Sequence, residues 1–320
     1  MKIFAALLAG LLAAAAMPAH AQSFPTRPVR VIIAFPAGSA TDIIGRVITA
    51  KVSEFWGQTV VTDNRGGAGG SIASAIAAKA PADGYTLIIN SSAHAVNPSM
   101  YARLPYDTQK DFIDVMPLVG QPNVLLVNPS ARWKNFGAFL SEAKANPGKI
   151  TFAFAGLGSG THLNAEKFKL AAGVDFNLIS YKGSAEAIND VIGGRVDCYF
   201  SPVSAGIGFV QGGKLRALAT TAAKRSAMLP DVPTVAESGV PGFEFILWFG
   251  LWAPAGTPPA IVNKIHQDFG RALADPAVSN KLAALGNEVM KMSPAEFRKF
   301  VRGQIDETAR LFKAAGIKPQ

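Results

Sequence analysis

The sequence predicts an α/β protein with two lobes, built on mixed sheets that helices cover. The first observation is alternation, because segments rich in β-branched residues are followed repeatedly by segments with helical apolar periodicity. The second observation is length. About 300 residues remain after an N-terminal leader, and a chain of this length is usually too long for a single hydrophobic core. The chain has no internal repeat and no low-complexity segment.

The expected elements follow one another in chain order. In the first part they are strand 29–35, helix 42–55, strand 59–63, helix 71–78 and strand 86–90. In the middle they are strand 123–127, helix 136–144, strand 151–155, helix 162–171, strand 177–181, helix 184–192, strand 198–200 and strand 215–220. A loop at 230–242 precedes strand 244–253, and the chain from 258 onward is expected to be helical, with breaks at Pro276 and Pro294.

The first 21 residues have the pattern of a secretory signal peptide. Lys2 precedes an apolar run of roughly 15 residues, and Ala19-His20-Ala21 forms a cleavage site, so the mature chain should begin at Gln22. A membrane anchor is the alternative, but a spanning helix needs about 20 apolar residues. Cys198 is the only cysteine, which excludes an intrachain disulfide and favours a small buried side chain over a nucleophile.

Three segments link a strand end to a helix start through small residues: 35–42, 65–71 and 155–162. The first N–H groups of a helix are free donors with a partial positive charge, so such turns can hold a carboxylate or phosphate without a basic side chain. In an open α/β sheet, ligands bind at the carboxyl ends of strands, where these turns gather. Ordinary capped turns remain the alternative.

The third turn differs from the known motifs it resembles. Gly156-x-Gly158-x-x-Thr161 lacks the last glycine of a dinucleotide fingerprint, and the lysine of a phosphate-binding P-loop is absent. A nucleophile elbow would need glycines where Leu157 and Thr161 flank Ser159. The hydroxyls of Ser159 and Thr161 add donors to the backbone, so the turn predicts anion binding, with no cofactor.

Charge and histidine placement limit the possible partners. The formal net charge is +9, and loss of Lys2 with the leader reduces it to +8, which favours an anionic partner. The basic residues are scattered without interleaved aromatics, so nucleic acid is not expected. His94, His162 and His266 form no metal-binding spacing, and no metal site is expected. His94 follows a strand end, where it contacts either ligand or local backbone.

A few other side chains have two interpretations. Asp197 stands in an apolar strand, either as a ligand or hinge group or as half of an ion pair. Phe35 lies in the first turn, where its ring either faces a cleft and selects the ligand or covers the core. The large aromatic residues of the late strand are expected to be core: Phe245, Trp248, Phe249 and Trp252.

Several stretches together resemble the periplasmic solute-binding receptors of tripartite tricarboxylate transporters, called Bug receptors. The matching stretches cover the whole mature chain: 25–42 (P-T-R-P-V-R-V-I-I-A-F-P-A-G-S-A-T-D), 61–70 (V-T-D-N-R-G-G-A-G-G), 82–87 (A-D-G-Y-T-L), 94–101 (H-A-V-N-P-S-M-Y), 181–183 (Y-K-G), 229–239 (L-P-D-V-P-T-V-A-E-S-G) and 248–258 (W-F-G-L-W-A-P-A-G-T-P).

This resemblance implies a type II, two-lobed periplasmic-binding-protein fold of the Venus flytrap kind. Lobe one would comprise 22–122 and 247–320, and lobe two 123–246. It also implies a monomeric periplasmic protein without enzyme activity. Such a protein would bind a small organic acid (a di- or tricarboxylate, an aromatic acid or an amino acid) and deliver it to the permease subunits of a membrane transporter.

The resemblance also implies a ligand site between the lobes. The 35–41 turn and the 91–94 loop would hold the ligand from lobe one and the 158–161 turn from lobe two, while Asp197 would contact an amino group. The candidate ligand-binding residues are Phe35, Gly38, Ser39, Ala40, Thr41, Ser91, Ser92, His94, Gly158, Ser159, Gly160, Thr161, Tyr181, Asp197 and Ser201. The family's usual first turn is P-x-G-G, and here Ser39 replaces the second glycine, adding a hydroxyl and narrowing the turn.

Two other functions fit an exported protein with anion-holding turns. One is an enzyme acting on an organic acid, although no nucleophile–base pair or metal set can be named in the sequence. The other is a sensor that presents the loaded protein to a signalling partner. A receptor, unlike an enzyme, would gain thermal stability from an organic acid and leave it chemically intact.

Overall fold

The computed structural model describes residues 24–320, so the predicted signal peptide, 1–21, and the expected start at Gln22 lie outside the described residues. The strands are β1 (Val29–Ile33), β2 (Val60–Asn64), β3 (Thr86–Ser91), β4 (Phe112–Val127), β5 (Thr151–Phe154), β6 (Asn177–Ser180), β7 (Cys198–Pro202), β8 (Arg216–Thr220), β9 (Ile246–Pro254) and β10 (Glu288–Val289). The helices are α2 (Ala40–Trp56), α3 (Ser71–Ala78), α4 (Ala93–Met100), α5 (Phe136–Ala145), α6 (Gly160–Ala172), α7 (Ser184–Ile192), α8 (Val203–Gln211), α9 (Pro259–Ala274), α10 (Pro276–Ala283) and α11 (Pro294–Ala314), with the short 3-10 helix η1 (Ala68–Gly70).

The strands form a mixed sheet in the order β2-β1-β3-β9-β4-β7-β5-β6, with β8 and β10 also paired to β4. Neighbours are parallel at β2-β1-β3 and at β7-β5-β6, and antiparallel where β9 and β4 take part. The predicted mixed α/β architecture is therefore confirmed.

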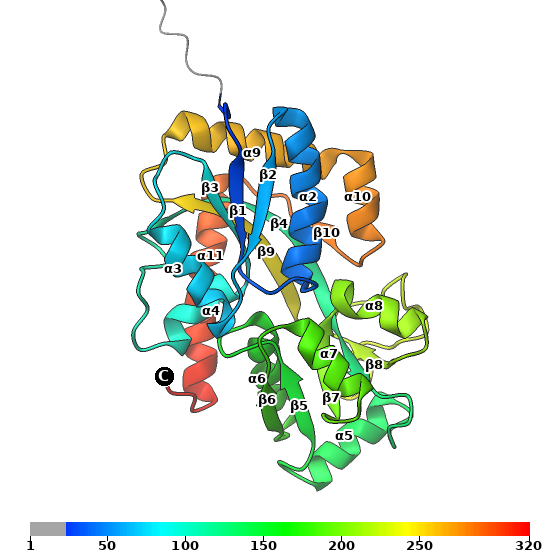
Figure 1. The fold of residues 1–320 in the computed structure, drawn as a ribbon. Helices are drawn as coiled ribbons and strands as arrows, with labels where there is room; N and C mark the ends of the chain where they lie inside the picture. The colour runs from blue at the N-terminus through cyan, green and yellow to red at the C-terminus, as the bar shows by residue number, and fades with distance from the viewer. Residues whose placement is uncertain (1–23) are drawn as a thin grey trace, which may run out of the picture.

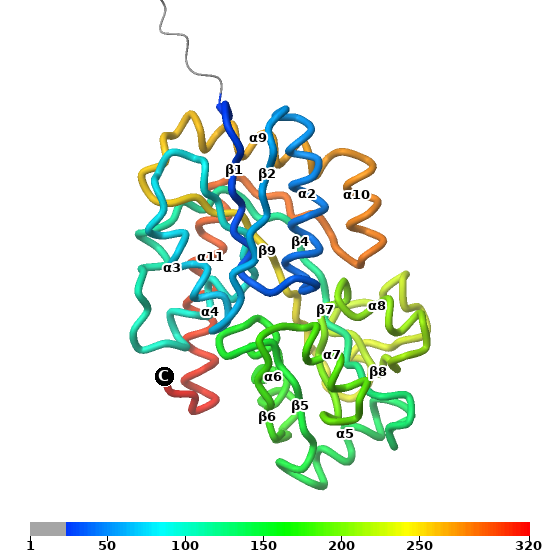
Figure 2. Tube along the Cα trace, viewed as in Figure 1, coloured from blue at the N-terminus to red at the C-terminus, as the bar shows by residue number. Residues whose placement is uncertain are grey.

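The sheet consists of two parts joined through the long strand β4 (Figures 1 and 2). We call β2, β1, β3, β9 and residues 112–122 of β4 the N-terminal half-sheet, and residues 123–127 of β4 with β8, β7, β5 and β6 the central half-sheet. The N–H of Phe245, just before β9, donates to the carbonyl of Thr221, just after β8, at 2.9 Å. The chain thus passes from one half-sheet to the other at two adjacent places, within β4 at residues 122–123 and just before β9 at residue 245.

Helices cover both faces of each half-sheet because strand residues alternate between two cores. In β1, Val31 and Ile33 pack in the core under α2 and α9, whereas Ile32 belongs to the core under α3 and α11. In the central half-sheet, Leu125 faces the core of α5 and α6, and Leu126 faces that of α7 and α8. Within residues 24–320 no helix is both long and apolar enough to cross a membrane.

Several elements differ from the sequence expectation. The segment from 258 onward was expected to be helical, but Glu288 and Val289 form the short strand β10, which pairs with Gly120 and Val119 of β4. Helix α4 contains Pro98 and was not expected, because proline normally ends a helix. The first part of β4 contains Pro117, which disfavours a strand prediction, and the register shifts at this position. Helix α8 was missed because its glycines, Gly206 and Gly208, weaken the helical pattern.

Candidate ligand-binding site

A small cavity lies where the carboxyl ends of strands from the two half-sheets meet. It is lined by Phe35, Ser39, Ala40, Thr41, Ser91, Ala155, Ser159, Gly160, Thr161, Ser184, Pro202, Leu247 and Phe249. Its volume is about 20 Å³, whereas about 10–15 Å³ is needed to hold one water. The cavity therefore has room for about one water and is smaller than an organic acid.

The first side of the cavity is the turn between β1 and α2. Gly38 has φ of 76°, a left-handed conformation that favours glycine. The Ser39 hydroxyl caps α2 by accepting the N–H of Asp42 at 3.3 Å, and the Ser39 N–H donates to Pro36 O at 3.1 Å. Since Ser39 has φ of −72°, this position does not need the glycine that the family's turn usually has. The hydroxyl is used as a helix cap.

The opposite side repeats this geometry in the turn between β5 and α6. Gly158 has φ of 76°, as Gly38 does. The Ser159 hydroxyl accepts the N–H of His162 at 3.1 Å, and the Ser159 N–H donates to Gly156 O at 3.0 Å. The sequences P-A-G-S-A-T-D (36–42) and G-L-G-S-G-T-H (156–162) thus form the same capped turn twice, once in each half-sheet.

Two helix N-termini therefore meet across one cavity. The first N–H groups of a helix have no intrahelical acceptor, and the serine cap satisfies only the third in each helix. The N–H groups of Ala40 and Thr41 on one side, and of Gly160 and Thr161 on the other, remain as donors. The described residues that line the cavity include no charged side chain. The arrangement suits two anionic groups held by backbone donors and helix dipoles.

Between the two turns the lining is apolar. Phe35 follows β1, and Leu247 and Phe249 are alternate residues of β9, so both project from one face of that strand. Phe35 is 5% exposed and also packs in the core under α3 and α11. Phe35 thus belongs both to the core and to the cavity lining, and its role in selecting the ligand stays a prediction.

A hydrogen-bonded chain supports the α6 side of the cavity. The Thr161 hydroxyl oxygen accepts the N–H of Ala155 at 2.9 Å and lies 3.0 Å from the Ser159 hydroxyl. The hydroxyls of Ser184 and Tyr199 are 2.9 Å apart. Burial raises the pKa of Tyr199 to about 12, so its phenol stays neutral and able to donate at physiological pH.

The structure brings eight of the fifteen sequence candidates to the cavity lining: Phe35, Ser39, Ala40, Thr41, Ser91, Ser159, Gly160 and Thr161. Gly38 and Gly158 shape the two turns without lining the cavity. Ser92 adjoins the lining, because a Cβ added at Gly160 would lie 2.4 Å from its Oγ.

Asp197 and two other candidates project elsewhere. Asp197 precedes β7, whose last residue, Pro202, lines the cavity, so it lies roughly 16 Å away at about 3.3 Å per residue. Its carboxylate accepts the N–H and hydroxyl of Thr151 at 2.8 and 2.7 Å. The Tyr181 hydroxyl donates to Asp190 at 2.8 Å, and that of Ser201 to the carbonyl of Pro202 at 3.1 Å. None of the three lines the cavity, and their contact with a ligand stays a prediction.

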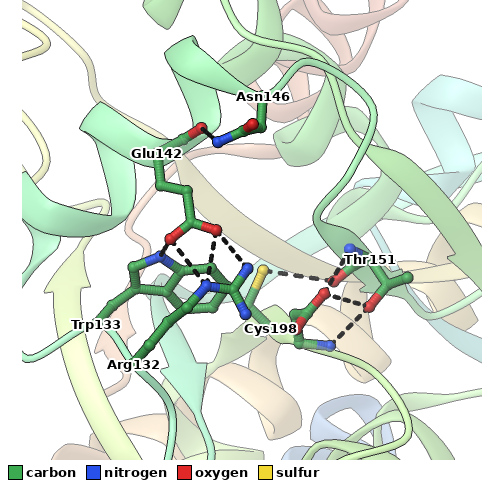
Figure 3. Close-up of polar contacts among 7 residues, drawn as sticks. Arg132, Trp133, Glu142, Asn146, Thr151 and Cys198 are labelled. Atoms are coloured by element: carbon green, nitrogen blue, oxygen red, sulfur yellow. Dashed lines mark hydrogen bonds and ion pairs between the residues drawn. The ribbon is translucent and has the colours of Figure 1, made fainter.

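Figure 3 shows the surroundings of Thr151, with Cys198 beside it. The Cys198 thiol is 3.7 Å from the carbonyl oxygen of Thr151. It is fully buried, and burial raises the pKa of the thiol well above its ordinary value. The expectation of a small buried side chain at Cys198 is confirmed.

His94 lies in the core instead of the cavity. Its ring centroid is 4.2 Å from that of Trp252 and 5.1 Å from that of Phe112, and neither ring nitrogen finds a hydrogen-bond partner within residues 24–320. Burial alone lowers the pKa of His94 to about 3. The expected hydrogen bond to backbone is therefore absent among the described residues, and His94 packs against aromatic rings outside the cavity lining, so its ligand contact stays a prediction.

We expect His94→Phe to flatten the loss of stability in acid. In the unfolded state His94 binds a proton at about pH 6.5, whereas in the folded state it does so only near pH 3. The contribution of His94 to the free energy of unfolding is therefore fully present above pH 6.5. It falls by at most about 1.4 kcal/mol per pH unit between pH 6.5 and pH 3. The variant removes this contribution but keeps His162, whose pKa burial lowers to about 4. Urea unfolding across this range measures the slope. An unchanged slope in His94→Phe would assign the acid sensitivity to other groups.

The sequence analysis missed five lining residues: Ala155, Ser184, Pro202, Leu247 and Phe249. Phe249 was expected to be core only. The alternation along strand 244–253 could have indicated that Leu247 and Phe249 share a face. Ser184 begins α7 directly after Y-K-G, another helix start at the end of a strand.

The second predicted turn, 65–71, does not line the cavity and instead contacts the turn between β5 and α6. A Cβ added at Gly69 would lie 2.1 Å from the carbonyl oxygen of Leu157. The Tyr101 hydroxyl donates to the same oxygen at 2.9 Å. In the described part of the chain, no group of three or more His, Cys, Asp or Glu side chains could hold a metal ion.

Comparison with known proteins places this site in a family context. The family described as tripartite tricarboxylate transporter family receptor matches residues 44–317. Protein BugT of Bordetella pertussis is 37% identical over 305 residues, covering 95% of this chain and 94% of BugT.

Solved structures agree over nearly the full length. A Rhodopseudomonas palustris protein with adipate has a TM-score of 0.89 and 37% identity, covering 93% of this chain and 100% of that one. MatC of the same organism, with bound malate, has a TM-score of 0.84 and 31% identity, covering 90% and 99%. The periplasmic binding protein BugD has a TM-score of 0.89 and 35% identity, covering 93% of this chain and 100% of that one, so the periplasmic-binding-protein fold expected from the sequence is confirmed.

Proposed function

Because this chain belongs to the family of tripartite tricarboxylate transporter receptors, we propose that it captures a dicarboxylate between its half-sheets and delivers it to a membrane permease. The family and the similar structures are solute-binding receptors and not enzymes. The observation that supports the ligand class is the repeated capped turn, which directs one helix N-terminus at each end of one cavity.

Each turn would hold one carboxylate. The Ala40 and Thr41 N–H groups would bind the first, and the Gly160 and Thr161 N–H groups the second, with the threonine hydroxyls as further donors. The carbon skeleton would lie against Phe35, Leu247 and Phe249. Adipate and malate, the ligands of two similar structures, are both dicarboxylates, which supports this assignment.

The half-sheets would act as two hinged lobes, 22–122 with 247–320 and 123–246. The crossings of β4 and of the chain near Phe245 would be the hinge. We further propose that the receptor is an exported, periplasmic monomer, in accord with the predicted leader and the periplasmic binding proteins among its relatives.

The test is calorimetry with dicarboxylates from succinate to adipate and with the matching monocarboxylates. A charged hydrogen-bonding group contributes about 1.5–3 kcal/mol, so removing one carboxylate from the tightest ligand should weaken binding roughly 10–150-fold. Equal affinity of a dicarboxylate and its monocarboxylate would contradict the two-turn arrangement. Recovery of the chemically unchanged acid after binding distinguishes a receptor from an enzyme that would convert it.

A further inference from the structure

A second pocket lies beside the N-terminal half-sheet, away from the candidate ligand cavity between the starts of α2 and α6. Three segments form it: residues 108–114 at the start of β4, the 255–256 turn after β9, and one face of α11. Its volume is about 240 Å³, against about 30 Å³ for a water in the liquid. The pocket therefore has room for a small polyatomic ion with a few waters. It shares no lining residue with the cavity.

Positive charge exceeds negative charge around this pocket. Lys110, Arg298 and Arg302 line it, and Asp114 is the lining carboxylate. Lys110 is paired with Asp107 at 3.1 Å and is largely exposed. Arg298 and Arg302 are four residues apart on α11, so their side chains project from the same face of the helix.

The lining carboxylate is already engaged on both of its oxygens. Asp114 Oδ1 accepts the indole N–H of Trp252 at 2.8 Å, and Oδ2 lies 3.8 Å from Nε of Arg298. Among residues 24–320, Arg302 makes no ion pair, although its charge acts on Asp114 by lowering the pKa that burial raises. Arg302 therefore lies near one carboxylate, that of Asp114, without a direct ion-pair contact among the described residues, and its side chain is exposed.

A buried hydroxyl in the same pocket lacks a partner. Thr108 lines the pocket and is 5% exposed, and its hydroxyl makes no hydrogen bond within the described chain. Leaving a buried donor unpaired is costly, so an acceptor that reaches this hydroxyl would stabilise the side chain. The hydroxyl and the two arginines together offer donors to an ion with several oxygens.

We propose that this pocket is a second anion-binding site, which takes a small oxyanion such as inorganic phosphate or a free carboxylate. The guanidinium of Arg302 binds two of its oxygens side by side, since its planar fork matches this geometry. Arg298, held by Asp114, and the hydroxyl of Thr108 bind from the other sides. The site is separate from the proposed dicarboxylate cavity, so both can be filled in the same molecule.

The test is a titration with inorganic phosphate at constant ionic strength, followed by calorimetry and by the melting temperature. We expect saturable phosphate binding, weakened at least about tenfold in Arg302→Gln. Arg310→Gln is the matched control, because it removes the same charge from the same helix at an exposed position outside the pocket. This control should bind phosphate as the unmodified protein does.

A second variant separates the pocket from general charge effects. Thr108→Val keeps the shape and net charge but removes the hydroxyl, and should weaken phosphate binding about tenfold. Titration with acetate in the same variants distinguishes a phosphate site from a carboxylate site, and an Arg302-dependent response to either ion supports the proposal. Absent binding of both ions at millimolar concentration, or equal losses in Arg302→Gln and Arg310→Gln, would overturn it.

Discussion

Gly69→Ala should weaken dicarboxylate binding at least about 100-fold, which corresponds to about 2.8 kcal/mol at 1.4 kcal/mol per tenfold. The added Cβ would lie 2.1 Å from the carbonyl oxygen of Leu157 and 2.8 Å from the carbonyl carbon of Gly158. Both are backbone atoms in the turn between β5 and α6, which belongs to the central half-sheet. The contact is therefore relieved only if the two half-sheets stay apart. Apparent affinity falls with the fraction of molecules that can close.

Gly57→Ala is the matched control for this variant. Gly57 has φ of 59° and Gly69 φ of 56°, so each alanine adopts a left-handed conformation at a similar cost of roughly 1–2 kcal/mol. At Gly57, however, an added Cβ meets no atom within 4 Å. Calorimetry with the tightest dicarboxylate compares the two variants, and small-angle scattering measures whether Gly69→Ala remains open. Equal affinity of both variants would show that closure tolerates a side chain at Gly69.

Much of the fold followed from local sequence patterns. Helices α3 and α7 have the predicted bounds, because small or polar residues mark their starts and apolar periodicity continues to their ends. Among the elements that were missed, α4, α8 and the first part of β4 contain proline or glycine, and β10 is only two residues long. These elements are stabilised by their neighbours, as α4 is by α11 and β10 by β4. Such tertiary stabilisation overrides the local preference and leaves no pattern in the segment itself.

The candidate site was predictable where backbone chemistry defines it. Gly38-Ser39 and Gly158-Ser159 indicate two helix starts with free donors, and both line or shape the cavity. The walls were harder to predict, since Leu247 and Phe249 have the same residue types as core. His94 adjoins a strand end in sequence, but its ring turns toward Trp252, a direction that sequence position does not specify.

Because the capped turn occurs twice, at 36–42 and 156–162, the contribution of a threonine hydroxyl to ligand binding can be separated from its contribution to stability. We expect Thr161→Val to weaken dicarboxylate binding roughly 10–150-fold, because a hydrogen bond to a charged group contributes about 1.5–3 kcal/mol. The variant also leaves the N–H of Ala155 without the acceptor that it has at 2.9 Å, so the protein itself should lose about 1–3 kcal/mol of stability.

Thr41→Val tests the same ligand contact without the second effect. Thr41 occupies the equivalent position in α2 and lines the cavity from the other side, and its hydroxyl makes no hydrogen bond recorded within residues 24–320. It should lose affinity by a similar factor while its urea unfolding stays unchanged. If Thr161→Val loses stability but keeps its affinity in calorimetry, the hydroxyl serves the turn alone. If neither variant loses affinity, the carboxylates are held elsewhere and the two-turn account fails.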